Sequence, residues 1–444
     1  MKHCFYVLFL ILICFSCHEE QIVPVEIDVA LHVKNDHTSP LSVAIENKTR
    51  NATNFLWTFE GGEPATSFSK NPKAVLFTTP GNHAITVEAW NDGHRASQTY
   101  TIRVDSMVTV DFLPEVDINN YAPATFKITN QTTGASSYHW TFQGGVPASY
   151  EGQFPPAITY AQKGNYIISL TVENGSASFT HSKEIEVRES LDASFAIVPS
   201  FEDEDDMEAP LRATFNAQLQ GVETLRWECA GATITNETSE EASIYFPSEG
   251  KYTVYLEVFN GKETKQVSQA ISINANTNLR THHDIRLGIN TAHETFPVYY
   301  STQLRRLISI SETKTIGSSV DIVYYGLNAG FSYNRFVSPD QLEETSHAAI
   351  PDAKATKFIN RTELGNIAIT PAQFNVMTTD ALLRDLPIAA IVYGDEPFSN
   401  NRLPHIVLFE TSDKRKGAIL VKEMVSDGAK GSYITIDIKV QKND

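Results

Sequence analysis

Four anchor residues recur three times in this chain at nearly constant spacing. A proline is followed 17 residues later by a tryptophan, then by a glycine 23 or 24 residues further on, and by an asparagine 10 residues after that. The three sets are Pro40–Trp57–Gly81–Asn91, Pro123–Trp140–Gly164–Asn174 and Pro210–Trp227–Gly250–Asn260. Because self-similarity at a fixed period is the signature of repeated domains, the anchors predict three homologous units of about 85 residues each.

The segments around the anchors have the pattern of short β-strands. The runs GNYIISLTVENG and GKYTVYLEVFNG, which begin at Gly164 and Gly250, alternate apolar and polar residues, as a strand with one buried face does. The Asn-Gly pair that ends each run is a hairpin signal, since both residues tolerate positive φ. The repeats show no helical stripe, and we therefore expect them to be all-β.

The phrase W-x-F-x-G-G at Trp57 and Trp140, with the glycine-led strand that ends in Asn-Gly, resembles the PKD domain, an immunoglobulin-like β-sandwich of extracellular proteins. The resemblance covers copy one (24–105), copy two (106–189) and copy three (190–274). It implies that the anchor tryptophans fill the cores, and that the copies are spacers or adhesive modules without catalytic residues. Copy three departs from the pattern, because Cys229 replaces a phenylalanine and Gly231 alone remains of the glycine pair.

The leader MKHCFYVLFLILICFSC resembles that of a bacterial lipoprotein. Its apolar run, from Phe5 to Phe15, is shorter than the roughly 20 residues that a membrane-spanning helix needs, but it suits a secretory signal. The resemblance implies a signal peptide over 1–16, a lipid on Cys17 and a tether over 17–23. The alternative is an ordinary signal peptide with an incidental cysteine.

Glu19 and Glu20, close behind Cys17, resemble the signal that sends Bacteroidota lipoproteins to the outer face of the outer membrane. We therefore expect the lipid to anchor the protein in the outer membrane, and the protein to face the cell exterior. Once the leader is removed and Cys17 carries lipid, Cys229 has no partner for an intramolecular disulfide. We expect it to pack as a small hydrophobic residue.

Residues 275–444, the terminal module, contain no fourth copy. Several strand-like runs and one stretch with helical character, TPAQFNVMTTDALLRDL, predict a β-rich domain with one or two short helices and Thr379-Asp380 as the cap of the second. A jelly-roll-like sandwich is one form that such a module takes. The module resembles C-terminal modules of Bacteroidota surface lipoproteins, a resemblance that brings no activity with it. The predicted fold class is all-β: tandem immunoglobulin-like sandwiches followed by this module.

The composition argues against several functions. A formal net charge of −18 repels phosphate backbones, so we expect no nucleic-acid partner. The sequence lacks the H-E-x-x-H, C-x-x-C, G-x-S-x-G and P-loop motifs, and we expect a protein that is not an enzyme.

Two groups of residues raise the question of a metal or a cofactor. The loop FEDEDDMEAP contains Asp203, Asp205 and Asp206, whose oxygens suit Ca²⁺. The interpretation that we favour is a solvated, self-repelling loop. The histidines of the terminal module are candidate ligands for haem or a metal, but we favour unconnected surface or hydrogen-bonded side chains; they are His282, His283, His293, His347 and His405. We therefore expect no cofactor.

Glycan binding is the leading function for the terminal module, because a sugar ring stacks on an exposed aromatic face. The candidate residues are Tyr299, Tyr300, Tyr325 and Tyr333, with Phe296 among the other aromatic residues considered and Trp90 of copy one as an outward-facing ring. A protein partner is the alternative; haem or metal capture and a role as a hydrolase accessory protein follow. The triplet at Ser106 resembles the D-S/T-apolar acceptor of O-glycosylation in Bacteroidota.

Overall fold

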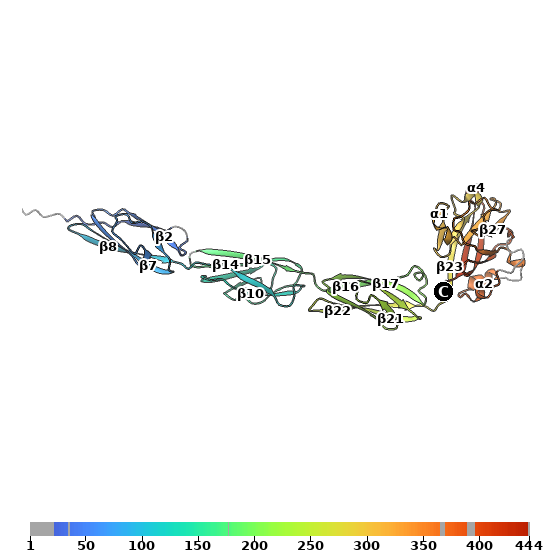
Figure 1. Cartoon of the computed structure of the whole chain (residues 1–444), viewed down its shortest axis with the longest axis horizontal. Helices are drawn as coiled ribbons and strands as arrows, with labels where there is room; N and C mark the ends of the chain where they lie inside the picture. Colours follow the sequence, from blue (N-terminus) through green and yellow to red (C-terminus); the bar gives the residue numbers. More distant parts are fainter. Residues whose placement is uncertain (1–21, 34–35, 176, 365–368, 389–395, 443–444) are drawn as a thin grey trace, which may run out of the picture. The chain divides into compact units, whose positions relative to one another are not determined.

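The computed structural model of this protein (Figure 1) describes residues 22–33, 36–175, 177–364, 369–388 and 396–442. Its contacts divide the chain into two compact units. The first contains the residues up to 198 with 213–244 and 252–271, and the second contains 199–212, 245–251 and 272–444. Within the described ranges, no helix is long and apolar enough to cross a membrane. The predicted signal peptide, Cys17 and most of the tether lie outside the described residues.

Copy one is a sandwich of two antiparallel sheets. The first sheet has the order β1 (Val29–Val33), β2 (Leu41–Asn47), β6 (Val75–Phe77), β4 (Gly62–Glu63), and the second has the order β5 (Thr66–Ser67), β3 (Asn54–Phe59), β7 (Gly81–Trp90), β8 (Arg95–Val104). Burial alternates along β7, as the sequence pattern predicts for a strand with one face in the core.

Copies two and three repeat this arrangement. In copy two the sheets are β13 (Ile158–Tyr160), β10 (Ala124–Asn130), β9 (Phe112–Val116), and β12 (Ser149–Glu151), β11 (Ser137–Phe142), β14 (Gly164–Glu173), β15 (Ser178–Val187). In copy three they are β16 (Asp192–Pro199), β17 (Leu211–Gln220), β20 (Glu241–Phe246), β19 (Thr233–Thr235), and β18 (Thr224–Cys229), β21 (Gly250–Phe259), β22 (Thr264–Ile273). The prediction of tandem all-β sandwiches is confirmed.

Each anchor tryptophan fills the centre of its sandwich. Trp57, Trp140 and Trp227 are at most 1% exposed. Each indole Nε1 donates a hydrogen bond to the backbone oxygen 12 residues further along the chain, which belongs to Ser69, Gly152 or Ser239 at 2.8–3.0 Å. A buried indole therefore has both an apolar environment and a hydrogen-bond partner in every copy, as we expected from the resemblance.

The glycine pair behind the tryptophan has a structural reason. Gly61 and Gly144 have φ of +73° and +71°, and a Cβ at either position would contact an aromatic ring or imidazole at less than 3.0 Å. Gly231 of copy three keeps this conformation with φ of +82°. Copy three therefore retains the turn despite its altered sequence. Its Cys229 is a free thiol of intermediate exposure, and partial burial raises the thiol pKa.

The terminal module is also a sandwich of two antiparallel sheets. The larger has the order β23 (Leu279–Gly288), β31 (Tyr433–Gln441), β30 (Lys416–Val425), β29 (His405–Glu410), β28 (Lys357–Ile359), and the smaller has the order β25 (Arg306–Ile308), β24 (Tyr299–Ser301), β26 (Ile322–Gly326), β27 (Asn334–Val337). In the described part of the module, strands 28 to 31 follow one another as a meander. The jelly-roll expectation is corrected, because consecutive strands pair within one sheet.

The helices of the module are short. They are α1 (Thr313–Ile316), α2 (Pro371–Val376), α3 (Ala381–Arg384) and α4 (Gly428–Gly431), with 3-10 turns η1 (Asn290–Ala292), η2 (Gly317–Ser319) and η3 (Thr362–Leu364). The sequence predicts one or two helices in this stretch, and two are present, α2 and α3. Asp380 stands at the start of α3, but its carboxylate bonds Arg384 and Asn278 instead of capping the helix. Thr370 forms a capping box with Gln373 at the start of α2.

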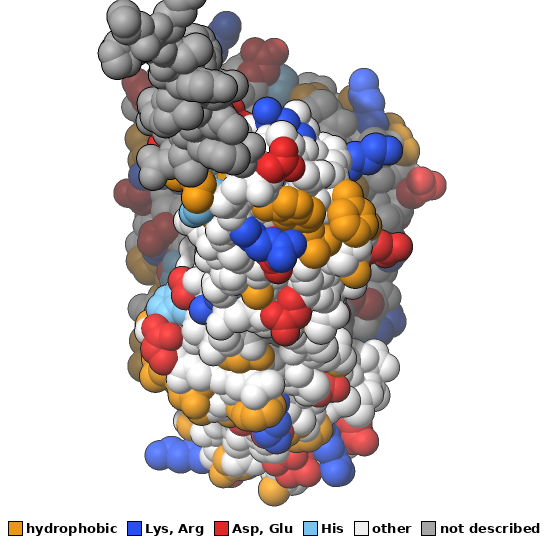
Figure 2. All heavy atoms as spheres, turned by 90° about the vertical axis from the view of Figure 1, so that its left-hand side faces the viewer, with side chains coloured by type: hydrophobic (Ala, Val, Ile, Leu, Met, Phe, Trp, Pro, Cys, Tyr) orange, Lys and Arg blue, Asp and Glu red, His pale blue; other side chains and the backbone are white. Residues whose placement is uncertain are grey.

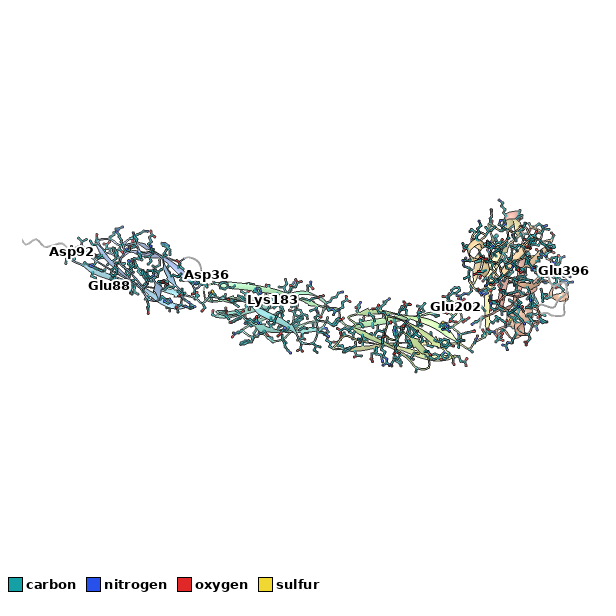
Figure 3. All side chains as sticks on the ribbon, in the orientation of Figure 1. Asp36, Glu88, Asp92, Lys183, Glu202 and Glu396 are labelled. Carbon is teal, nitrogen blue, oxygen red and sulfur yellow. The ribbon has the colours of Figure 1, made fainter. Side chains whose placement is uncertain are left out.

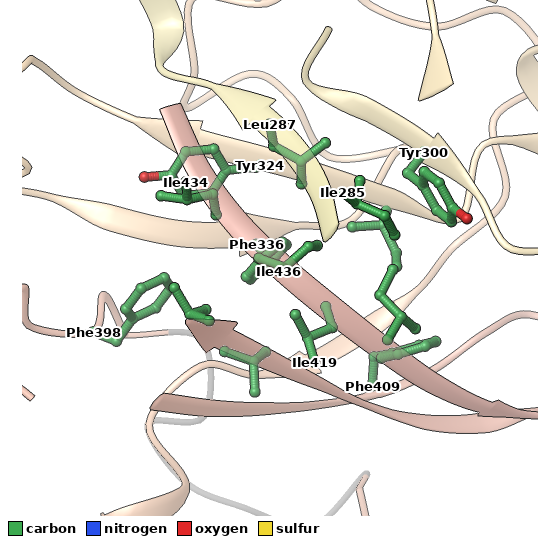
Figure 4. Packing of buried hydrophobic residues seen from close by; sticks show 14 of the residues in the cluster. Ile285, Leu287, Tyr300, Tyr324, Phe336, Phe398, Phe409, Ile419, Ile434 and Ile436 are labelled. Carbon is green, nitrogen blue, oxygen red and sulfur yellow. The ribbon is translucent and has the colours of Figure 1, made fainter. Parts of the chain in front are cut away.

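Three hydrophobic clusters surround these two sheets. The cluster between the sheets contains side chains from both, such as Leu287 of β23, Tyr324 of β26 and Ile436 of β31 (Figure 4). A second cluster covers the other face of the smaller sheet, and a third, with α2 and α3, covers the other face of the larger one. Strands covered on both faces are apolar at consecutive positions, and all five residues of β26 are accordingly buried.

Candidate ligand-binding groove

The tyrosines that the sequence favoured for sugar stacking lie in the core. Tyr299, Tyr300 and Tyr325 are 2%, 3% and 9% exposed, and Tyr333 is half-buried and packs against the ring of Tyr325. Burial raises the pKa of the Tyr299 and Tyr300 hydroxyls. The expectation of an exposed tyrosine row is therefore wrong, because the smaller sheet is covered on both faces and alternation does not expose half of its residues.

Trp90 ends β7 and is not a core residue, as the sequence predicted. It is half-buried, and the guanidinium of Arg95, its cross-strand neighbour, lies 4.6 Å from the ring centroid. This cation occupies part of the ring surface that a sugar would need. The other exposed aromatic residues of the described sandwiches include Phe68 and Phe154, which are more than 70% exposed.

The acidic loop is held by cations, so it is not self-repelling. Asp205 pairs with Arg305, whose guanidinium also bonds Glu204 at 3.0 Å, and Asp206 lies 2.7 Å from Lys442. Asp203 accepts hydrogen bonds from the Ser200 hydroxyl and the Arg212 backbone. Glu202, labelled in Figure 3, accepts from Arg280 through its backbone oxygen.

These pairings separate the three candidate calcium ligands, because each carboxylate faces a different donor. Among the described residues, no group of three or more acidic, histidine or cysteine side chains is arranged to hold a metal ion. The interpretation of this loop as self-repelling is corrected, because salt bridges within the second compact unit hold its carboxylates.

The histidines of the terminal module lie in several environments, most of them buried or hydrogen-bonded. Burial lowers the pKa of both His282 and His347 to about 4, and the His347 ring packs among Tyr299, Tyr325 and His293. His405 is buried, and its Nε2 lies 2.6 Å from the backbone oxygen of Asn360. His283 is exposed and its Nδ1 lies 3.3 Å from Asp437.

A shallow groove of about 510 Å³ lies on the terminal module, beside β23, β24 and β25. It is lined by His282, His283, Asp284, Ile285, Arg286, Thr295, Phe296, Pro297, Tyr300, Arg305, Arg306 and Leu307. Its volume falls in the range of small-ligand sites, about 300–1,000 Å³. Its lining combines aromatic, cationic and hydroxyl-bearing side chains.

A bulge in β23 shapes this groove. The pairing of β23 with β31 shifts between His282 and Ile285, and Asp284 has a φ of +57°. The Asp284 backbone nitrogen donates to the Asp437 carboxylate at 2.8 Å, and Lys422 bonds both carboxylates at 2.5 and 2.7 Å. The extra residues of a bulge change the direction of neighbouring side chains. Here the affected side chains form one wall of the groove.

The lining residue Phe296 packs against Tyr433, which lies behind the groove lining, beside a cation. The half-buried rings of Phe296 and Tyr433 have centroids 4.5 Å apart, and the guanidinium of Arg286 lies 5.1 Å from the Tyr433 centroid. A partly exposed ring offers a face for an apolar sugar surface, while Arg286 and Thr295 offer polar contacts. This combination of an apolar ring face and polar groups suits the binding of a sugar.

Sequence reasoning recovered only part of this groove. Phe296 was one of several aromatic candidates, and His283 was considered only as a haem ligand. Arg286 stands between Ile285 and Leu287, so strand alternation places it outward, but nothing local marks it as part of a groove. Tyr433 comes more than 130 residues later and reaches Arg286 only because β31 pairs with β23.

Ser106 lies between the strands of copies one and two. Its side chain is half-buried, and its backbone oxygen accepts a hydrogen bond from the Asn174 side chain at 2.9 Å.

On the face shown in Figure 2, acidic and basic side chains are interspersed and hydrophobic side chains occur in small groups.

Comparison with known proteins identifies the fold of the repeats. The PKD domain family matches residues 26–104 and 117–187, which lie in copies one and two. Comparison with curated protein sequences gives no significant match. Together with the paired sheets of each copy, the family match establishes tandem immunoglobulin-like domains of a kind that is typically structural and non-catalytic.

Several solved structures of tandem domains show a distant likeness. An I-band fragment of titin is 14% identical, covers 57% of this chain and 100% of its own, and has a TM-score of 0.35. The cadherin domains of protocadherin gamma B7 are 12% identical, over 55% of this chain and 71% of theirs, with a TM-score of 0.23. Extracellular domains of Drosophila OTK are 9% identical, over 54% and 93%, with a TM-score of 0.22. Likeness at this level carries no argument about function.

Proposed function

We propose that this protein is a non-enzymatic lipoprotein of the outer membrane, in which the PKD-like copies act as a spacer and the terminal module binds a glycan at the groove beside β23. The observation that carries the proposal is the Phe296–Tyr433 pair next to Arg286 and Thr295. Sugar-binding sites need a flat apolar surface with polar groups at its edge, and the groove provides both.

The side chains of the copies support a spacer role for the repeats and a binding role for the terminal module. Their most constrained residues, the anchor tryptophans and the glycines behind them, are used for packing and turns. A residue already satisfied by its core contacts is not available to a ligand. The copies therefore fit the role of a spacer, a use to which PKD-like domains are suited.

Glycan binding is tested with the whole mature chain on a panel of neutral and charged oligosaccharides. Phe296→Ala should weaken the best ligand by about tenfold, because a stacked ring contributes on the order of 1 kcal/mol or more. The control is Phe68→Ala, which removes an exposed ring of copy one and should leave affinity unchanged. A wild-type chain that binds no saccharide would overturn the glycan proposal and favour the alternative of a protein partner.

Anchoring is tested by Cys17→Ala. The variant should lose lipid attachment and leave the membrane fraction, while Cys229→Ala should stay in it. Unchanged membrane partitioning of the Cys17 variant would contradict the proposed anchor. Protease treatment of intact cells distinguishes the external from the periplasmic face. The same preparation, analysed by mass spectrometry, shows whether Ser106 carries a glycan.

A further inference from the structure

We propose that the groove selects a negatively charged saccharide, a pyranose that carries a carboxylate or a sulfate, and that Arg286 receives this charge. The inference rests on the proposed glycan function and adds the chemical class of the ligand. It is drawn from the ion pairs around the groove, from the position of the Arg286 guanidinium and from the aromatic rings beside it.

Several charged residues of the groove are already compensated by ion pairs. Arg305 is engaged by Glu204 and Asp205, and Arg306 bonds Glu312 at 2.8 Å. The carboxylate of Asp284, in turn, is engaged by Lys422. The charges of these lining residues are therefore balanced by partners at their sides.

Arg286 differs from its neighbours. Its side chain is exposed, and among the residues that the structure describes it has no carboxylate within salt-bridge distance. Its guanidinium lies 5.1 Å from the centroid of the Tyr433 ring. The groove thus contains one uncompensated guanidinium in a chain whose formal net charge is −18. Exposed arginines without a salt bridge occur elsewhere in the described chain, as at Arg212 over the Tyr245 ring. What distinguishes Arg286 is its place in the lining of this groove, next to Phe296.

The position of the Arg286 guanidinium beside a ring suits an anionic ligand. A guanidinium held near an aromatic ring keeps its planar fork of donors, which matches the two oxygens of a carboxylate or sulfate. The ring of Phe296 packs against the same tyrosine, with centroids 4.5 Å apart. The apolar ring surface and the Arg286 guanidinium therefore both lie beside Tyr433. A pyranose over Phe296 would bring a substituent of the ring within reach of Arg286.

The experiment compares matched charged and uncharged ligands on the whole mature chain by titration calorimetry. One pair is oligogalacturonate and its methyl ester, and the other is dextran sulfate and dextran. The wild-type chain should bind the charged member of at least one pair about tenfold more tightly than the neutral member, because a charge-assisted hydrogen bond adds affinity of about this size. The two pairs distinguish a carboxylate from a sulfate ligand.

Arg286→Gln should bring the affinities for the charged and neutral members to within about twofold of each other, because the charged member loses a charge-assisted hydrogen bond and the neutral member loses at most a weaker one. Arg286→Lys keeps the charge without the planar fork and should retain an intermediate preference, which also checks that substitution at this position preserves the fold. The matched control is Arg95→Gln, another exposed arginine beside an aromatic ring, which should behave as wild type.

The outcomes separate the two proposals. Equal binding of charged and neutral members, or a preference that survives Arg286→Gln, would overturn the inference and leave the glycan function standing. Absence of binding to every saccharide would overturn both.

Discussion

At the scale of single residues, the chain shows how one residue type serves opposite roles. Trp57, Trp140 and Trp227 fill cores and donate to a backbone oxygen, whereas Trp90 stands at the end of a strand with Arg95 beside it. The difference follows from strand phase, since Trp90 alternates with the buried Ala89. Position in the strand, rather than side-chain chemistry, decides whether an indole is a core residue or a surface residue.

The residue whose removal should cost the most stability in copy two is Trp140. Trp140→Ala should lower the free energy of unfolding by about 3–5 kcal/mol, because it leaves a large cavity between the sheets. Chemical denaturation of the chain, followed by circular dichroism, measures the change. The control Trp90→Ala should cost less than about 1 kcal/mol; a similarly small loss for Trp140 would show that the sandwich alignment is wrong.

Buried histidines make the terminal module sensitive to acid. The folded-state pKa values of His282 and His347 are about 4, below the usual 6.5, so between these values the unfolded chain binds more protons and stability falls as pH falls. Each of the two histidines should lower the free energy of unfolding by about 2 kcal/mol at pH 5 relative to pH 7. Thermal unfolding at both pH values measures the loss.

The matched variants for this prediction are His347→Phe and His32→Gln. The phenylalanine keeps a ring in the cluster with Tyr299 and Tyr325 and should reduce the acid-induced loss by about 2 kcal/mol. His32 is an exposed residue of β1, and its substitution should leave the loss unchanged. An unaltered pH dependence in the phenylalanine variant would contradict the assignment.

At the scale of elements, the Asn-Gly hairpins do more than reverse the chain. The glycines Gly175 and Gly261 take positive φ, while the asparagines act through their side chains. The Oδ1 atoms of Asn174 and Asn260 each accept from backbone nitrogens of their own hairpin. The Nδ2 of Asn174 donates to the Thr38 hydroxyl and to the Ser106 oxygen, both at 2.9 Å. The side chain of Asn174 thus links neighbouring segments of the first unit.

This link can be measured with a double-mutant cycle. Asn174→Ala should destabilise copy two by about 1–3 kcal/mol, because it removes a buried side chain with several hydrogen bonds. Thr38→Val removes one acceptor while keeping the shape of the side chain. The coupling between the two substitutions should be about 1 kcal/mol in denaturant unfolding. Additive effects would show that the Asn174–Thr38 hydrogen bond contributes nothing to stability.

At the scale of the whole molecule, two kinds of β-sandwich use their residues differently. In the copies, each strand buries one face, and burial alternates along β14 and β21. In the terminal module, β26 and β29 are buried at consecutive positions, because further clusters cover the outer faces of both sheets. The copies, with one buried face per strand, are suited to repetition in tandem. The groove lies in the terminal module, whose sheets are covered on both faces.

Deletion of copies one and two, residues 24–189, tests the proposed division between spacer and binding module. Affinity of the purified protein for its saccharide should stay within about threefold, or ~0.7 kcal/mol, because the groove lies in the terminal module. Capture of the same saccharide by intact cells should weaken, since the module would lie nearer the membrane. Loss of binding in solution would place the site in the repeats, with Trp90 as the first residue to test.

The repeated sandwiches, their core tryptophans and two of the module's short helices, α2 and α3, could be predicted from the sequence. Strand alternation is local, and the anchors recur in the same order in each copy, so the pattern could be recognised without coordinates. The acidic loop, the buried tyrosines and the groove were decided by tertiary structure alone. Arg305 reaches Asp205 across 100 positions, and Tyr433 reaches Arg286 through the pairing of β31 with β23. Such contacts depend on which sheet covers which face, and this information is absent from any single stretch of the chain.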